Sequence, residues 1–370
     1  MAHQVLVLAP HCRGAATEER LSDNLTVRRF RYAPEALESL AYEGGILERL
    51  RQRRWRFLLV PFFVAAELVA ALRAVRRERP DVIHAHWIVP QGLVGVLAAL
   101  MAPTSKRPAV VCTSHGADLF ALRGLLAMQL KGCVVRRAAA LTVVSAAMKT
   151  IAMRLGTRAE KVRVLPMGVD ARQRFAPAHG VVRAANELLF VGRLVAKKGV
   201  GNLLNAFARV REAVPHARLT IVGAGPLEAE LRASARSQGL EPHVSFAGAV
   251  LNEELPPYYR RATVFVVPSV VAPDGDQEGL GLVIGEALAC ECPVVASDLP
   301  AIRDLIEDGV TGLLARPGDA GDLADKLLGV LRNPGAAAAL AHRGRGLVLE
   351  RFDWQSVGQR YEELFAAVAG

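Results

Sequence analysis

The chain has 370 residues, enough for two domains of ordinary size, and its 52% hydrophobic content allows large cores and excludes an extensively disordered protein. Lys and Arg (46) outnumber Asp and Glu (36), which gives a net charge of +10. This moderate excess suits phosphorylated ligands or an anionic membrane, and because the sequence contains none of the nucleic-acid-binding motifs, we expect no nucleic-acid partner.

The first ten residues, MAHQVLVLAP, lack a charged segment followed by a long apolar run, so they predict a first strand rather than a signal peptide. The five cysteines are an odd number and show no Cys-x-x-Cys spacing. We expect them to be reduced and structural, which favours a cytoplasmic protein.

In the first half, short apolar runs that end at polar or small residues predict buried parallel strands. They are residues 4–9, 25–32, 81–86, 109–114, 140–144 and 162–165. Helical patterns lie between them, the longest over residues 46–79 with an interruption expected at Pro61. Strands that alternate with helices predict an α/β domain around a parallel sheet.

A basic cluster opens the long helical region. It contains Trp55 and the arginines Arg49, Arg51, Arg53, Arg54 and Arg56. The following residues 57–72 are apolar except for Glu67, but Pro61 and the charge make them a poor transmembrane span. Two interpretations stay open: a helix packed on the sheet with a solvated basic end, or an interfacial membrane element over residues 49–63. In the second, arginines bind phospholipid heads, the acceptor is lipid-linked, and the inserted side chains are Trp55, Phe57, Phe62 and Phe63.

The second half follows a segment without periodicity, residues 171–187, which we expect to be a linker. Strands are predicted at 188–191, 218–222, 244–247, 263–267 and 293–296, and helices at 322–333, 336–350 and 355–368. The turn after the first of these strands reads Gly-Arg-Leu-Val-Ala-Lys-Lys-Gly from Gly192. Arg193 and Lys198 are five residues apart across this turn, so both can converge on one diphosphate.

Residues 267–298 form a second strand–loop–helix–strand unit, with the helix expected to begin near Leu280. In parallel sheets the loop after such a strand is where ligands bind. Glu278 and Glu286 are eight residues apart, which on an ideal helix is a turn of about 800° and a rise of about 12 Å. They therefore suit the two ends of an elongated ligand, with the helix N-terminus binding a phosphate between them, as a nucleotide sugar would require.

Glu278-x7-Glu286, within DGDQEGLGLVIGEALACECPVVASD, resembles the signature of retaining glycosyltransferase family 4, which has the GT-B fold. His115-Gly116-Ala117-Asp118 and the turn at 192–199 resemble two further motifs of that family. The resemblance implies an α/β protein of two doubly wound, Rossmann-like domains facing a cleft. The acceptor domain would be residues 1–172, the nucleotide-sugar domain 187–352, and residues 353–370 a helix that crosses back to the first domain.

The resemblance also implies roles for single residues. His115 would lie near the donor sugar, Arg193 and Lys198 would neutralise the departing diphosphate, and Glu278 would contact the sugar hydroxyls. Val250 would lie in the loop that contacts the base, and the Glu286 carboxylate would contact the ribose. Backbone amides at the phosphates would come from Gly14, Gly279, Leu280, Gly281 and Leu282.

His84 and His86 share a face of their predicted strand but lack an evident third metal ligand. By the resemblance, His86 or Trp87 would line the acceptor cleft, and core packing is the alternative. Asp274-Gly275-Asp276 imitates the metal motif of another glycosyltransferase fold, and we expect no metal there.

The implied reaction moves a hexose from a nucleoside-diphosphate sugar to a glycan, glycolipid or small-molecule acceptor with retention, without a metal or other cofactor. We expect the protein in the cytoplasm, with the inner face of the membrane as an alternative. Two other functions stay open: a nucleotide-sugar 2-epimerase of the same layout and a non-catalytic nucleotide-sugar binder.

Overall fold

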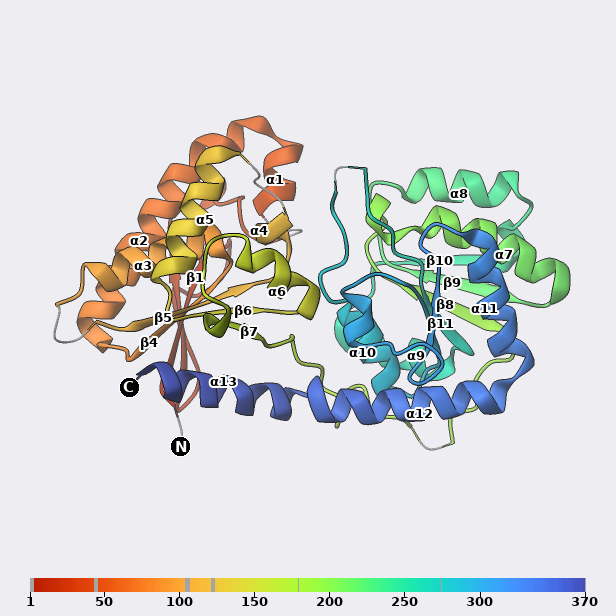
Figure 1. The fold of residues 1–370 in the computed structure, drawn as a ribbon. Coiled ribbons are helices and arrows are strands. Elements are labelled where there is room, and N and C mark those ends of the chain that lie inside the picture. Colours follow the sequence, from red (N-terminus) through yellow and green to blue (C-terminus); the bar gives the residue numbers. More distant parts are fainter. Residues whose placement is uncertain are drawn as a thin grey trace.

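A computed structural model describes residues 3–42, 46–103, 107–120, 124–178, 180–273 and 275–369. Two α/β halves lie side by side, and the last two helices run along the lower side of both in the view of Figure 1. Each half has strands at its centre and helices around them.

In the part of the second half that the structure describes, the strands form one six-stranded sheet, in which all neighbouring strands are parallel. Its strands are β8 (Glu187–Val191), β9 (Arg218–Val222), β10 (Val244–Gly248), β11 (Val264–Val267), β12 (Val294–Ser297) and β13 (Leu313–Ala315). Their order is β10-β9-β8-β11-β12-β13, so the direction of winding reverses between β8 and β11. Ligands of doubly wound sheets bind at this reversal, outside the carboxyl ends of the strands.

Helices cover both faces of this sheet. Along β8, Leu188 and Phe190 pack in one buried cluster, whereas Leu189 and Val191 pack in another. Because side chains alternate along a strand, both faces must be covered, which explains the continuous apolar run. The helices are α7 (Val200–Ala213), α8 (Glu228–Ser237), α9 (Pro256–Arg261), α10 (Leu282–Ala289), α11 (Ala320–Arg332) and α12 (Pro334–Arg351).

The described residues of the first half form two sheets. The larger is parallel, with the order β4 (Val82–His86), β5 (Ala109–Ser114), β6 (Ala140–Val143) and β7 (Val162–Val164). In the smaller, β1 (Val5–Pro10) pairs parallel with β3 (Leu25–Phe30), and β2 (Glu18–Ser22) pairs antiparallel with β3. Strand β2 was not expected, because its five residues are all exposed and carry no apolar alternation.

The helices of the first half are α1 (Ile46–Gln52), α2 (Leu59–Glu78), α3 (Leu93–Leu100), α4 (Ala117–Phe120), α5 (Leu125–Arg137) and α6 (Ala146–Met153). A 3₁₀ segment, η2 (Arg54–Leu58), connects α1 to α2. The interruption expected at Pro61 is wrong: Pro61 lies in the first turn of α2, where no intrahelical hydrogen bond needs its missing N–H.

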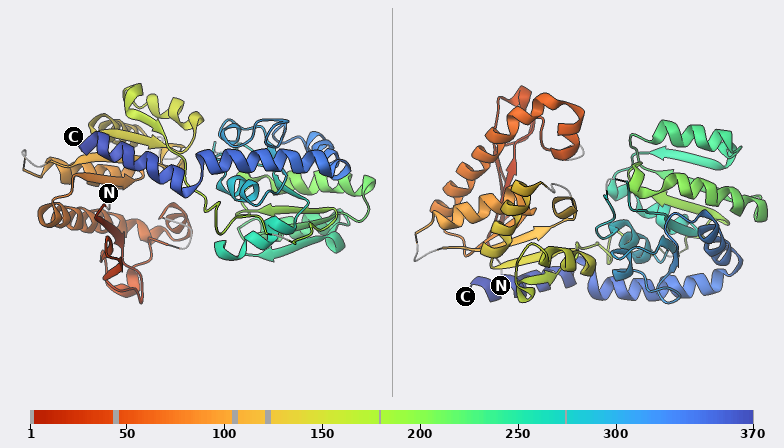
Figure 2. Two further views of the ribbon diagram at one scale, coloured as in Figure 1. Left: turned by 90° about the horizontal axis from the view of Figure 1, so that it is seen from below. Right: turned by 45° about the horizontal axis from the view of Figure 1, so that its top comes forward.

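The final helix, α13 (Trp354–Ala369), crosses from the second half to the first, as Figure 2 shows from below. The Tyr361 hydroxyl lies 3.4 Å from Thr113 Oγ1 and 3.3 Å from Thr142 Oγ1, on neighbouring strands β5 and β6. Its ring centroid lies 5.3 Å from that of His84 on β4. The predicted crossing of the C-terminal helix is therefore confirmed.

The predicted membrane element has an exposed apolar side. Trp55, Phe57, Leu58 and Phe62 are 42%, 57%, 73% and 64% exposed. Among the described residues, Arg54–Glu78 is the helical stretch long and apolar enough to span a membrane, and 28% of its most apolar window is buried. Core helices of other proteins also reach this length and apolar composition.

Two residues expected on this surface are inside instead. Phe63 is 3% exposed and packs edge-on against Phe30 and Tyr32, because it lies on the face of α2 that meets the core rather than on the exposed face that carries Phe62. The Arg56 guanidinium is also buried and donates to the Arg49 carbonyl oxygen at 2.9 Å. The insertion of Phe63 and the lipid contact of Arg56 that the membrane interpretation required are therefore wrong.

Candidate functional site

The turns after β8 and β11 are joined at the winding reversal. Gly199 takes a left-handed backbone at the start of α7, and a Cβ there would lie 1.9 Å from the Pro268 carbonyl oxygen. The Val270 N–H also donates to the Lys197 carbonyl at 2.8 Å. Only glycine permits this approach, which brings the turn carrying Lys198 against the loop carrying Glu278.

Lys198 and Glu278 form an ion pair across these turns. Lys198 Nζ donates to Glu278 Oε2 at 2.6 Å, and the two side chains are only 15% and 12% exposed. Burial raises the pKa of Glu278, but the charge and hydrogen bond of Lys198 outweigh it, so that pKa is lowered overall. The Glu278 carboxylate is therefore ionised at neutral pH.

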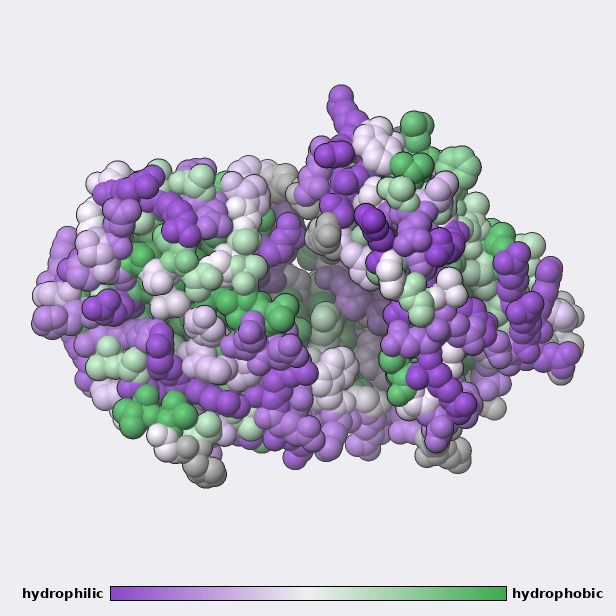
Figure 3. Space-filling model, turned by 180° about the vertical axis from the view of Figure 1, so that it is seen from behind, coloured by the Kyte–Doolittle hydropathy of each residue, from purple (hydrophilic) through white to green (hydrophobic). Residues whose placement is uncertain are grey.

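Two cavities adjoin the pair. One, of about 260 Å³, is lined by Gly192, Arg193 and Val250 among others. The other, of about 280 Å³, is lined by Glu278 of the second half and by residues of the first, and Figure 3 shows a hollow between the halves. A Cβ on Gly192, which lines the first cavity, would be 3.7 Å from Lys198 Cε, and Lys198 Nζ binds Glu278, which lines the second.

The start of α10 faces the same region. The helix begins at Leu282, two residues later than expected, and Gly281 caps it with a left-handed backbone and no side-chain hydrogen bond. A Cβ on Gly279 would lie 3.3 Å from the His115 carbonyl oxygen, so this loop touches the first half. The helix therefore presents amides without a side-chain cap, the property that suits an anion.

His115 follows β5 and belongs to a pair of imidazoles. Its Nε2 lies 2.9 Å from His86 Nδ1, and the rings stack with centroids 5.2 Å apart. Asp118 fixes the turn by accepting from the His115 N–H and the Ser114 hydroxyl at 3.2 and 2.9 Å. Burial lowers the pKa of His115. Burial, and to a smaller extent the electrostatic effect of the neighbouring His115, lowers the pKa of His86 to about 4. Both rings are therefore neutral at pH 7.

Glu286 lies inside α10 and is 4% exposed. Asn252 Nδ2 donates to its Oε1 at 3.0 Å, and the Tyr259 hydroxyl donates to its Oε2 at 2.9 Å. Burial raises its pKa, against the effect of these two hydrogen bonds. Sequence reasoning missed both partners, because an isolated Asn or Tyr carries no pattern.

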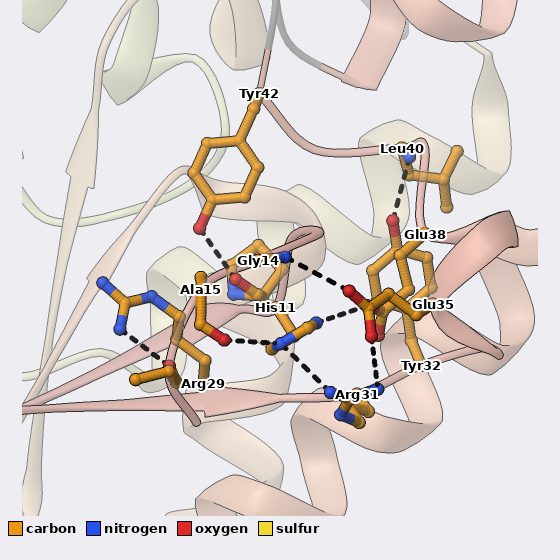
Figure 4. A network of polar contacts seen from close by, with 12 residues as sticks. His11, Gly14, Ala15, Arg29, Arg31, Tyr32, Glu35, Glu38, Leu40 and Tyr42 are labelled. Carbon is orange, nitrogen blue, oxygen red and sulfur yellow. Dashed lines mark hydrogen bonds and ion pairs between the residues drawn. The ribbon is translucent and has the colours of Figure 1, made fainter. Parts of the chain in front are cut away.

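Gly14 belongs to a network of polar contacts after the end of β1 (Figure 4). Its N–H donates to Glu35 Oε1 at 3.1 Å, and this contact is the main reason that the pKa of Glu35 is lowered. Nearby, His11 Nδ1 lies 2.5 Å from Glu38 Oε2, with both side chains buried. The amide predicted to reach the donor phosphates is therefore occupied by a carboxylate.

No group of three or more His, Cys, Asp or Glu side chains able to hold a metal occurs among the residues that the structure describes. Asp274, the first residue of the Asp-Gly-Asp run, lies outside them. Asp276, the last residue of that run, accepts from Lys197 Nζ at 3.1 Å.

Models of two protein families together match most of the chain. The model described as Glycosyltransferase Family 4 matches residues 1–173, and the one described as Glycosyl transferases group 1 matches residues 185–333. A glycogen synthase of Mycobacterium tuberculosis is 30% identical over 297 residues, which are 79% of this chain and 70% of that protein.

The chain belongs to glycosyltransferase family 4. The predicted family is thereby confirmed. Two other relatives match shorter stretches. The amylovoran biosynthesis glycosyltransferase AmsK of Erwinia amylovora is 37% identical over 180 residues, 49% of this chain and 44% of AmsK. A GDP-mannose-dependent phosphatidylinositol monomannoside mannosyltransferase of Mycolicibacterium smegmatis is 34% identical over 212 residues, 55% of each. The chain thus spans about half the length of these two relatives.

Solved structures agree on the GT-B fold of this family member. Sucrose-phosphate synthase from Thermosynechococcus elongatus superposes with a TM-score of 0.77 at 25% identity, covering 98% of this chain and 90% of that one. HepE from Anabaena, solved with UDP and glucose, gives a TM-score of 0.71 at 23% identity, covering 92% and 86%. The predicted fold is confirmed.

Proposed function

We propose that this protein is a retaining glycosyltransferase that moves a hexose from a nucleoside-diphosphate sugar to an acceptor hydroxyl without a metal ion. The observation that carries the proposal is the meeting of Lys198, Glu278 and the uncapped start of α10 at the winding reversal, with Arg193 on the adjoining cavity. These are two cations, a carboxylate and free amides at the edge where doubly wound sheets bind nucleotides.

In the proposed donor complex, the diphosphate lies between the two cavities. Lys198 has three N–H donors, so its bond to Glu278 leaves two for a phosphate oxygen. Arg193 offers a planar fork to the same diphosphate. Glu278 accepts from hexose hydroxyls, Val250 borders the base, and Glu286 accepts from the ribose. The amides at Gly281 and Leu282 complete the anion site, with Gly279 and Leu280 leading into it.

The reaction is a same-face displacement. The bond between the anomeric carbon and the β-phosphate oxygen breaks with its electron pair on that oxygen. The acceptor oxygen bonds to the anomeric carbon from the same face, and its proton passes to the departing phosphate. No enzyme nucleophile is required. Arg193, Lys198 and the α10 amides stabilise the growing negative charge, which is the main catalytic contribution.

His115 approaches this centre from the first half, next to Gly279. As a neutral imidazole it can donate to a hexose hydroxyl or accept from one, depending on the tautomer that His86 selects. A neutral ring adds no positive charge beside the oxocarbenium-like carbon, which suits this position.

The relatives support a sugar donor of this kind. The relative from Mycolicibacterium smegmatis is named as GDP-mannose-dependent, and the other two are named as a glycosyltransferase and a glycogen synthase. We propose residues 1–172 as the acceptor domain, 187–352 as the donor domain and 353–370 as the crossing helix.

The test is acceptor-dependent release of nucleoside diphosphate from a panel of UDP- and GDP-sugars, with EDTA in a parallel series. A transferase releases diphosphate only with acceptor, and proton NMR of the product shows the donor's anomeric configuration. A 2-epimerase interconverts the donor without acceptor, and a binder turns nothing over. Loss of activity in EDTA would refute metal independence.

We also propose that the protein works in the cytoplasm at the inner face of a membrane, on a lipid-linked acceptor. Trp55, Phe57, Leu58 and Phe62 form an exposed apolar strip on η2 and α2, and Arg53 and Arg54 flank it. Aromatic rings beside arginines suit the interface of an anionic bilayer. The mannosyltransferase relative is named for a phosphatidylinositol acceptor.

A further inference from the structure

Tyr259 is a buried tyrosine whose hydroxyl binds the Glu286 carboxylate. It lies on α9, is 0% exposed, and packs edge-on against Phe175 and Phe265 with centroids 6.1 and 5.2 Å away. Its hydroxyl donates to Glu286 Oε2 at 2.9 Å. Since two phenylalanine rings and the core hold this phenol in place, the direction of its hydrogen bond is fixed.

The other oxygen of Glu286 has a different partner. Oε1 accepts from the Nδ2 of Asn252, an exposed residue that is itself held by Arg174 Nη1 at 2.9 Å. An ionised carboxylate can accept about four hydrogen bonds, so both oxygens keep spare capacity. The two oxygens therefore differ: Oε2 is bound from the core by Tyr259, whereas Oε1 is bound from the side of the exposed Asn252.

That side is the nucleotide end of the proposed site. Val250 and Leu255, which flank Asn252 in sequence, line the cavity that also holds Arg193. Glu286 is held by Asn252 and Tyr259, whereas Glu278 is held by Lys198. In the proposed site, Glu286 is the acceptor for the hydroxyls of a ribose. Its orientation thus decides how well a ribose diol is held.

We propose that Tyr259 is a positioning residue that holds the Glu286 carboxylate for the ribose hydroxyls of the bound nucleotide. The proposal rests on the function proposed above, and it adds a residue that touches no ligand. A hydrogen bond from a fixed phenol keeps the carboxylate plane in one orientation and stabilises its ionised form, which can accept from both ribose hydroxyls.

The test uses Tyr259→Phe, which keeps the ring and its contacts and removes only the hydroxyl. Titration calorimetry compares UDP and GDP with their 2′,3′-dideoxy forms on wild type and variant. We expect the variant to bind the ribose nucleotide about tenfold more weakly, the scale of one hydrogen bond to a charged group. We expect the dideoxy nucleotide, which has no diol to place, to bind wild type and variant within about twofold of each other.

The matched control is Tyr32→Phe, which also removes one buried hydroxyl bond, to Leu40 N at 2.9 Å in the first half. It should leave both affinities unchanged. A second measurement repeats Tyr259→Phe in a Glu286→Ala background, where the hydroxyl has no carboxylate to hold and its loss should not change affinity.

Equal weakening of ribose and dideoxy nucleotides by Tyr259→Phe would show a merely structural role and overturn the proposal, as would unchanged affinity for both. Failure of the wild-type protein to bind either UDP or GDP would instead overturn the proposed function, so the two failures are distinct.

Discussion

Lys198 Nζ and Glu278 Oε2 lie 2.6 Å apart although 80 residues separate them in the chain. The contact exists because Gly199 lets the turn after β8 meet the loop after β11 at the winding reversal. It places a cation for a phosphate and a carboxylate for a sugar side by side, so the bond that breaks in the proposed reaction would lie between them.

Removal of either proposed diphosphate cation should slow turnover. We expect Arg193→Ala and Lys198→Ala each to lower kcat by about 10²–10³-fold, the scale for losing one transition-state donor. The measurement is acceptor-dependent release of nucleoside diphosphate. Lys197→Ala is the matched control, since Lys197 pairs with Asp276 instead, and it should retain activity within about tenfold. Full activity of the Lys198 variant would remove its assignment.

The Lys198–Glu278 pair should also make stability depend on pH in a defined direction. The pKa of Glu278 is lowered from 4.5 in the folded protein, so the ionised form stabilises the fold above pH 4.5 and that contribution is lost as the pH falls through the lowered value. We expect Glu278→Gln to reduce the free energy of unfolding by about 2 kcal/mol at pH 7. Urea denaturation should show this difference shrinking below pH 4.5; a difference that grows there would contradict the ion pair.

Gly14 supplies a prediction about donor affinity. Its N–H is bound by Glu35, so a phosphate at Gly14 must displace a carboxylate. If Gly14 binds the donor, Glu35→Ala should lower the donor KM by about threefold, the net value of one hydrogen bond. Glu19→Ala, which removes another surface glutamate paired with an arginine of the same half, is the control and should leave KM unchanged. An unchanged KM in Glu35→Ala would separate Gly14 from the donor site.

The membrane proposal predicts binding to anionic vesicles. The triple variant Trp55→Ser, Phe57→Ser, Phe62→Ser should co-sediment with phosphatidylglycerol vesicles roughly tenfold less than wild type, because three exposed apolar side chains are lost. The control variant replaces two leucines on another helix by Ser. They are Leu125 and Leu126, which are 87% and 71% exposed. Absence of wild-type binding to these vesicles would defeat the proposal.

Much of the fold was accessible from the sequence because its strands are short apolar runs buried on both faces. The strands at Ala109–Ser114 and Arg218–Val222 occur at the predicted residues. The exposed strand β2 and the direction in which Phe63 points were not accessible. Both depend on tertiary pairing rather than on local pattern.

For the candidate site, sequence reasoning brought together Arg193, Lys198 and Glu278 but missed their immediate surroundings. Spacing indicated that Arg193 and Lys198 lie on one turn, yet it could not show that Lys198 pairs with Glu278 rather than standing free. Tyr259 lies in the run Pro-Pro-Tyr-Tyr-Arg-Arg, and nothing local distinguishes it from Tyr258. Only the packing of α9 against α10 selects it.

A crystal structure of the protein with UDP or GDP bound tests the proposed diphosphate site directly. We predict diphosphate oxygens within hydrogen-bond distance of the Arg193 guanidinium, Lys198 Nζ and the first amides of α10, with the ribose hydroxyls at Glu286. A nucleotide bound elsewhere, or one whose diphosphate contacts none of these groups, would contradict it.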